Sequence, residues 1–471
     1  MTSGINFWDN GVWSLIITLT ILLAAMMIAN ILRRTIKPLR QSMIPSSVLG
    51  GFLALGANYL FKELTGNPIF SQSVLETLTY HGLGLGFVAM SLRTIERKAN
   101  EKKSDAFDAG VTVVATYLLQ ATLGLAITIG LSYLLGNFSA SGLLLPMGFG
   151  QGPGQAYNWG RTYETTYGFE NGTSFGLTVA AMGFIAASIG GIIYLNVMRK
   201  KGKFSGETGS GKESETVTAS SIMGKNEIPL SESMDKLTVQ VALVFIAYIL
   251  AYLFMSGVNL LINTGILGDF GYNTVQPLIW GFNFLFGTLF ALLLKGVLKR
   301  LRKKNIIHRE YTNNFMQSRI AGFMFDIMVV ASIAAIDLSA FSHKEFIIPL
   351  LSVCVVGASA TYLYLNYVCK KVYPAYRDEA FLSLYGMLTG TASTGVILLR
   401  EIDQRFETPA SNNLVYHQPW AILFGFPIML LLSVAPKGLT QAYLTFGILA
   451  VLLIALNVIS FRKSIFRTKK K

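Results

Sequence analysis

The sequence predicts an all-α polytopic membrane protein with two inverted five-helix repeats, a re-entrant hairpin in each repeat, and an extra C-terminal helix. Three observations carry this prediction: long apolar segments, basic residues confined to alternate loops, and two unusual stretches at matching places in the two halves. Of the 471 residues, 52% are hydrophobic and only 14% are charged. Because a soluble domain carries about 25% charged residues, this composition indicates lipid as the solvent.

Apolar runs long enough to cross a bilayer recur along the chain. About 20 apolar residues span the hydrocarbon core as a helix, and segments such as 111–135 and 237–261 reach that length. No basic segment and no small-residue cleavage site flank the first run, so we expect it to be retained as a helix. The predicted spans are 12–31, 46–62, 76–92, 108–135, 173–198, 237–262, 276–296, 315–337, 345–368, 416–435 and 440–460.

The net charge of +14 follows from topology. With the N-terminus outside, the inside loops, the inside ends of the spans and the C-terminal tail hold 34 of the 39 Lys and Arg residues. This asymmetry is the positive-inside rule, so the charge does not indicate binding to nucleic acid. We expect a bacterial cytoplasmic (inner) membrane protein with the N-terminus outside and the C-terminus inside.

Residues 199–236 divide the chain into two halves. This segment is rich in Ser, Gly, Lys and Glu and has no apolar period, which is typical of a solvated cytoplasmic linker. Residues 1–198 then form one repeat of five spans, and residues 237–435 form the other. Because five is odd, the second repeat enters the membrane from the opposite side. Residues 436–471 hold the extra span and a basic cytoplasmic tail.

One stretch in each half is too rich in small residues for an ordinary span. The first is PMGFGQGPGQAYNWG (Pro146–Gly160) and the second is GMLTGTASTGVILLR (Gly386–Arg400). Helix packing is the alternative reading for either stretch alone, since small residues in membrane helices most often serve it. Their matching places favour two re-entrant hairpins, over 137–167 and 378–401, whose tips meet near the midplane.

Each hairpin arm is too short to cross the bilayer. The arms 137–150 and 153–167 are about 14 residues each, or roughly 20 Å as helix. Residues 378–388 and 393–401 are the predicted arms of the second hairpin, which is inverted relative to the first. Gly152 is expected to cap the second arm and Pro153 to begin it.

The hairpin tips are suited to binding an anion and a sodium ion. Helix N-termini with free N–H groups attract a carboxylate, while unwound carbonyls and hydroxyls suit sodium. The predicted substrate-binding residues are Gly150, Gln151, Gly152, Pro153, Gly154, Gln155, Thr391, Asp326 and Arg400. The predicted sodium-binding residues are Gly390, Thr391, Ala392, Ser393 and Thr394.

Two charged residues each allow a functional interpretation and an alternative to it. Asp326 is the one carboxylate well inside a predicted span, suited to a sodium ion, a proton or a substrate amino group. The alternatives are a structural pair with Arg319, two turns earlier, and a place close to the interface. Arg400 follows the second hairpin and is positioned to meet an entering anion, or else it is a positive-inside anchor.

Several motifs together resemble a transporter family. They are SMIPSSVLGGFLALG (Ser42–Gly56), GLGFVAMSLR (Gly84–Arg93), GFGQGPGQAYNWG with the following YETTYGFENGT, and LTGTASTGVILLREIDQRF. This set resembles the bacterial sodium/glutamate symporters of the glutamate:sodium symporter (ESS) family. The resemblance implies two inverted repeats with re-entrant loops, a homodimer, and sodium-coupled glutamate uptake by an elevator-like movement.

The sequence departs from that family's pattern at the hairpin tips. Phe149, Gln151 and Pro153 stand where the family has Gly, His and Thr, and Ser393 stands where it has Pro. The linker is also longer, and the eleventh span is an addition. These changes bear on the substrate more than on the fold.

The predicted function is secondary active symport of glutamate or a similar small carboxylate, with sodium as coupling ion and no other cofactor. A passive channel that uses the hairpins as a filter is the alternative, although opposed hairpins within one chain favour alternating access. A membrane enzyme is not expected. The four His residues share no spacing for a metal site or a catalytic dyad, and no P-loop occurs.

Overall fold

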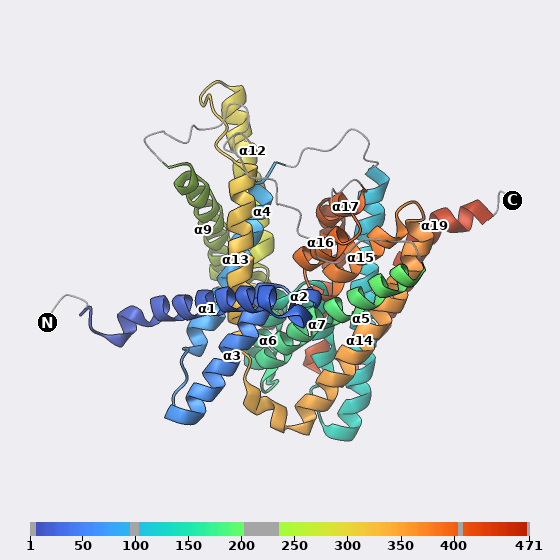
Figure 1. The fold of residues 1–471 in the computed structure, drawn as a ribbon, viewed down its shortest axis with the longest axis horizontal. Helices are drawn as coiled ribbons and strands as arrows, with labels where there is room; N and C mark the ends of the chain where they lie inside the picture. The colour runs from blue at the N-terminus through green and yellow to red at the C-terminus, as the bar shows by residue number, and fades with distance from the viewer. Residues whose placement is uncertain (1–5, 95–102, 202–234, 404–407, 469–471) are drawn as a thin grey trace. The chain divides into compact units, whose positions relative to one another are not determined.

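The computed structural model describes residues 6–94, 103–201, 235–403 and 408–468 (Figure 1). Within these ranges the regular secondary structure is helical, and no β-strand occurs. Eight of the described helices are long and apolar enough to cross a membrane. The chain is therefore an all-helical, multi-pass membrane protein, as the sequence predicts.

The described helices belong to two compact units, each of which we describe separately. The first unit comprises the described residues of Met1–Glu76, Ala99–Thr208 and Val330–Lys471, and the second those of Thr77–Lys98 and Gly209–Val329. Each unit draws on both halves of the chain, so neither coincides with one predicted repeat. The helices shared between the units are α4 (Gln72–Leu92) and α13 (Asn314–Ala334).

The remaining helices are assigned as follows. The first unit holds α1 (Asn10–Thr35), α2 (Lys37–Gln41), α3 (Ser46–Thr65), α5 (Lys103–Leu135), η1 (Ser139–Leu143), η2 (Pro146–Gly150), α6 (Pro153–Tyr167), α7 (Gly172–Lys200), η4 (Leu338–Ser342), α14 (Lys344–Val372), α15 (Arg377–Thr389), α16 (Ala392–Arg400), α17 (Ala410–Tyr416), α18 (Gln418–Leu432), η5 (Ala435–Lys437) and α19 (Leu439–Thr468). The second unit holds α9 (Lys236–Asn263), α10 (Gly268–Phe270), η3 (Gly271–Val275), α11 (Gln276–Gly281) and α12 (Asn283–Lys303).

Three predicted spans are helical but are not among these eight apolar helices. They are 46–62, 76–92 and 276–296, which correspond to α3, α4 and the pair α11 and α12. The third was expected to be one continuous helix, and this was wrong. Phe282 leaves the helical backbone region, with φ −101° and ψ 25°, and separates α11 from α12.

Stacked aromatic rings fix α15 to α7 within the first unit. The rings of Tyr194 on α7 and Phe381 on α15 stack with centroids 4.0 Å apart, and Phe381 stacks on Tyr385 at 5.5 Å. The Tyr194 hydroxyl also donates to Asp378 Oδ1 at 2.7 Å. All three rings are buried, so this cluster holds the first helix of the second candidate stretch on a fixed support.

Glycines on α4 serve packing within the second unit. A Cβ at Gly84 would meet the ring of Tyr248 on α9, and one at Gly86 would meet the ring of Phe325 on α13. The Tyr248 hydroxyl is fixed by His81 Nδ1 at 2.9 Å and by Asn283, whose Nδ2 donates to it at 3.2 Å. Small residues here allow helices to approach closely, as is usual in membrane proteins.

The extra C-terminal helix α19 is part of the first unit. Its Arg462 pairs with Asp108 of α5 at 2.6 Å, and the Arg462 guanidinium lies over the Phe107 ring, 4.8 Å from its centroid. Farther along α19, Asn457 Oδ1 accepts from the Tyr364 hydroxyl of α14 at 2.9 Å. These contacts fix α19 to both α5 and α14.

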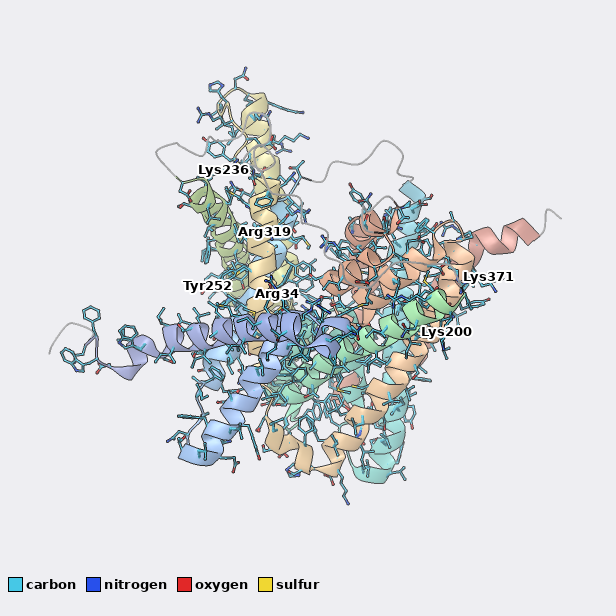
Figure 2. All side chains as sticks on the ribbon, in the orientation of Figure 1. Arg34, Lys200, Lys236, Tyr252, Arg319 and Lys371 are labelled. Carbon is cyan, nitrogen blue, oxygen red and sulfur yellow. The ribbon has the colours of Figure 1, made fainter. Side chains whose placement is uncertain are left out.

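Basic residues gather at the C-terminal ends of three spanning helices of the first unit. The last turns of α1, α7 and α14 contain Arg34, Lys200 and Lys371 respectively, which Figure 2 labels. These ends are the ones that the charge distribution predicts to be inside the cell. Most of the predicted linker 199–236 lies outside the described residues, and the structure adds only that α7 ends at Lys200 and α9 begins at Lys236.

Candidate functional site

The first candidate stretch is a helix broken at Gln151–Gly152, which we call the first turn. Gly152 has φ 85° and ψ −178°, a backbone conformation that is essentially restricted to glycine. After it, α6 runs from Pro153 to Tyr167. The predicted bounds of this arm, its Gly152 cap and its first residue Pro153 are confirmed.

The arm before the first turn differs from the regular α-helix predicted over 137–150. It consists of the 3₁₀-helix η1 followed by the π-helix η2. Pro146 has no N–H to donate to the preceding turn, and Gly142 lies directly against the Gly124 backbone of α5. Tertiary packing therefore determines the type of helix in this arm. Short π-helical segments of this kind are frequent at functional sites.

The second candidate stretch is a helix broken at Gly390–Thr391, which we call the second turn. Before it α15 ends at Thr389, and after it α16 begins at Ala392, within one residue of the predicted arms. Thr391 makes no side-chain capping hydrogen bond, and its Oγ1 lies 3.4 Å from Oγ1 of the buried Thr394. The two hydroxyls therefore share one side of the second turn.

The two turns lie against each other. A Cβ at Gly152 would lie 3.4 Å from Cγ2 of Thr391 and 3.8 Å from the carbonyl oxygen of Gly390, both within van der Waals contact. The two helix breaks are therefore in contact, while their place at the tips of re-entrant hairpins near the midplane stays a prediction. A Cβ would fit at position 152, so it is the backbone conformation that requires glycine there.

Helix α5 connects the two broken helices. The Tyr117 hydroxyl donates to the carbonyl oxygen of Gly150 at 3.1 Å, next to the first turn. One turn later, Gln120 Nε2 donates to the carbonyl oxygen of Leu388 at 2.9 Å, next to the second turn. Neither residue was among the predicted site residues. The available signal was a single amide, Gln120, in an otherwise largely apolar span.

Helix α7 supports both broken helices from another side. A Cβ at Gly183 would overlap the carbonyl oxygen of Thr389 on α15, and would lie 3.0 Å from the Phe149 ring on η2. Only a residue without a side chain lets α7 pack this closely against the ends of both helices. The relative position of the two turns therefore depends on Gly183.

The ends of four helices bring opposite partial charges to this place. The N-termini of α6 and α16 have no side-chain cap and carry partial positive charge. The C-terminal ends of η2 and α15 present carbonyl oxygens and partial negative charge. Such an arrangement is able to hold an anionic group and a cationic group side by side.

Most of the predicted site residues lie at the two turns. Gln155 is 1% exposed, and Gln151 is half-buried. Thr394 is buried, whereas its neighbour Ser393 is exposed. The predicted residues at the turns are Gly150, Gln151, Gly152, Pro153, Gly154, Gln155, Gly390, Thr391, Ala392, Ser393 and Thr394.

Of the two remaining predicted residues, Arg400 lies at the other end of α16 and Asp326 belongs to the second unit. Arg400 is exposed at the far end of α16, eight residues beyond Ala392, which is about 12 Å at the rise of an α-helix. Arg400 therefore does not belong to the same cluster as the turns. Asp326 is an exposed residue of α13 in the second unit, so its role stays a prediction. Its suggested partner Arg319 lies over the Phe315 ring.

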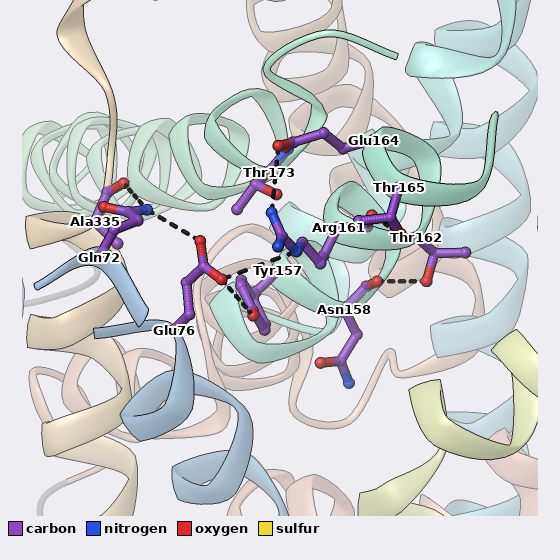
Figure 3. Close-up of polar contacts among 10 residues, drawn as sticks. All are labelled: Gln72, Glu76, Tyr157, Asn158, Arg161, Thr162, Glu164, Thr165, Thr173 and Ala335. Carbon is purple, nitrogen blue, oxygen red and sulfur yellow. Dashed lines mark hydrogen bonds and ion pairs between the residues drawn. The ribbon is translucent and has the colours of Figure 1, made fainter. Parts of the chain in front are cut away.

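A network of charged side chains fixes α6 beyond the first turn (Figure 3). Glu76 accepts from the Tyr157 hydroxyl at 3.2 Å, and its Oε2 lies 3.9 Å from Nε of Arg161. Arg161 also pairs with Glu164 at 3.3 Å, and Glu164 accepts from the backbone N–H of Thr173 at 2.9 Å. Glu76 thereby ties the start of α4 to α6, a role that its place at the end of a predicted span did not reveal.

Neutralising Glu76 should loosen α6. Glu76→Gln removes the charge facing Arg161, whose side chain is 44% exposed, so we expect a loss of about 1 kcal/mol or less in stability. The measurement is the thermal unfolding temperature of the purified protein at low and high salt. Glu63→Gln, at an exposed position of α3, is the control and should not change this temperature. Equal temperatures for both variants and the unmodified protein would contradict the role of Glu76.

No protein-family model matches the chain, and no curated protein shows significant similarity to it.

Proposed function

We propose that this chain is a secondary active transporter that couples sodium to the uptake of glutamate or a similar small carboxylate. The observation that carries the proposal is the contact between the turns of two broken helices, at Gly152 and at Gly390–Thr391, within a helical membrane protein. Broken helices that meet in this way supply both helix N-termini and free carbonyls, the groups with which transporters bind anions and cations.

The substrate carboxylate and the sodium ion bind at different helix ends. The substrate carboxylate binds at the N-terminus of α6, beside the backbone of Gly154 and Gln155, and Gln151 borders it. Sodium is a hard cation that takes oxygen ligands, so it binds beside the Thr391 and Thr394 hydroxyls and the Gly390 carbonyl. Ligands bound this close together stabilise the same arrangement of the turns, and this is what couples one to the other.

The transport mechanism follows from the proposed architecture. Each half of the chain is one five-span repeat with its broken helix as a re-entrant hairpin, and the two repeats have opposite orientations. The resemblance to the glutamate:sodium symporters supports this arrangement, an elevator-type movement and a homodimer. The basic ends of α1, α7 and α14 support an inner-membrane protein with its C-terminus inside.

Flux into proteoliposomes tests the proposal. Saturable uptake of radiolabelled L-glutamate that requires an inward sodium gradient is the expected result. Thr394→Val should weaken the apparent sodium affinity about tenfold, since one oxygen ligand is lost. Ser393→Ala, at the exposed neighbouring position, is the matched control and should keep normal sodium dependence. Unsaturable downhill flux would instead indicate a channel, and no flux of small carboxylates would refute the proposal.

A further inference from the structure

The side chain of Gln120 is fixed in one orientation between the two turns. It is 1% exposed, and its Nε2 donates to the carbonyl oxygen of Leu388 at 2.9 Å and to Oγ1 of Thr361 at 3.0 Å. A backbone carbonyl only accepts hydrogen bonds, so the amide nitrogen must face Leu388. The amide oxygen, Oε1, is therefore directed away from α15.

This oxygen faces the end of the π-helix η2. It lies 3.3 Å from the place where Gly150 would carry a Cβ, one residue before the first turn. Among the described residues, Gln120 Oε1 is buried and has no hydrogen-bond partner. The neighbouring Gly150 carbonyl oxygen already accepts from Tyr117. The structure thus holds an acceptor without a donor directly behind the first turn.

An unsatisfied acceptor at this depth indicates a ligand. Buried polar atoms are almost always hydrogen-bonded, and burying an amide oxygen without a donor destabilises the fold. The C-terminal end of η2, which Oε1 faces, adds partial negative charge on the same side. The chemistry that satisfies all of these groups is a small cation.

We propose that Gln120 Oε1 binds the cationic group of the transported pair, an inference that rests on the proposed symport function. Two groups share this chemistry: the ammonium group of an α-amino acid and the coupling sodium ion. Either one would connect α5 to the ligand while Nε2 connects α5 to α15. Gln120 would thus respond to occupancy of the site through one end of its amide and hold the second turn through the other.

Binding of L-glutamate and of 2-oxoglutarate to the purified protein in nanodiscs, at varied sodium concentration, tests this role. The two compounds share carboxylates and differ in the ammonium group. Gln120→Met removes both amide atoms, whereas Thr361→Val removes only an acceptor on the nitrogen side and is the matched control. We expect Gln120→Met to weaken binding about tenfold, the effect of one lost charge-assisted hydrogen bond, and Thr361→Val to change it little.

The pattern of the loss identifies the cation. Weaker binding of L-glutamate alone assigns Oε1 to the ammonium group, whereas a weaker sodium dependence with both compounds assigns it to sodium. Gln120→Glu keeps an oxygen facing the first turn but loses the N–H donors, so it should bind the cation better than Gln120→Met does. Equal losses in Gln120→Glu and Gln120→Met, or normal binding by Gln120→Met, would overturn the inference. If the unmodified protein binds neither carboxylate nor sodium, the proposed function fails instead, and this role of Gln120 with it.

Discussion

Replacing Gly152 with alanine should reduce sodium-driven uptake to background while the protein still inserts and purifies. The backbone of Gly152, at φ 85° and ψ −178°, is strained for any residue with a side chain, at a cost of about 1–3 kcal/mol. The added methyl group would also come into van der Waals contact with Cγ2 of Thr391, 3.4 Å away, where the two turns meet. Uptake of radiolabelled L-glutamate into proteoliposomes measures the effect.

A second glycine of the same helix supplies the control. Gly168 caps the other end of α6 at φ 72° and ψ 25°, and a Cβ there would meet nothing within 4 Å. Alanine in this left-handed conformation costs only about 1–2 kcal/mol, so Gly168→Ala should keep most of the uptake. If both variants lose uptake equally, the stability of α6 explains the loss, and the turn has no special role.

Gly183→Ala should both lower the thermal unfolding temperature and abolish uptake. The new Cβ would overlap the Thr389 carbonyl oxygen, a backbone atom that cannot rotate away, and would press on the Phe149 ring at 3.0 Å. Overpacking of this kind typically costs about 1–3 kcal/mol. Because α7 supports both broken helices at this position, the turns should separate.

Gly130→Ala is the matched substitution for Gly183→Ala. Gly130 lies within α5 and is exposed, and a Cβ added there would meet nothing within 4 Å. Alanine is the better helix former by about 1 kcal/mol, so the unfolding temperature should stay the same or rise. If the Gly183→Ala protein is as stable and active as the Gly130→Ala protein, close packing of α7 against the two turns is not required.

The parts of the site that were predictable from sequence depend on local chemistry. Gly152 followed by Pro153 specifies where α6 begins, since glycine permits the turn and proline is favoured in the first helical turn. The bounds of α15 and α16 followed from the small residues between them, Gly390 and Thr391. Matching places in two halves then indicated that these breaks should meet.

The parts that were missed depend on contacts across long stretches of chain. Gln120 binds partners 241 and 268 residues away, so its spacing along α5 carries no sign of them. The π-helix η2 likewise reflects packing around Pro146 and could not follow from helix propensity. The exposure of Asp326 could not be predicted either, because a position within a predicted span does not determine which face of the helix the residue occupies.

The pairing of Asp108 with Arg462 has a consequence for biogenesis. The two residues are 354 positions apart, and ribosomes add about 5–20 residues per second, so the partner of Asp108 is synthesised roughly 20–70 s later. Throughout that interval α5, with Tyr117 and Gln120, is already made while α19 is not. The final packing of α5 must therefore follow translation of α19, which makes assembly of the region around the two turns a late step in membrane insertion.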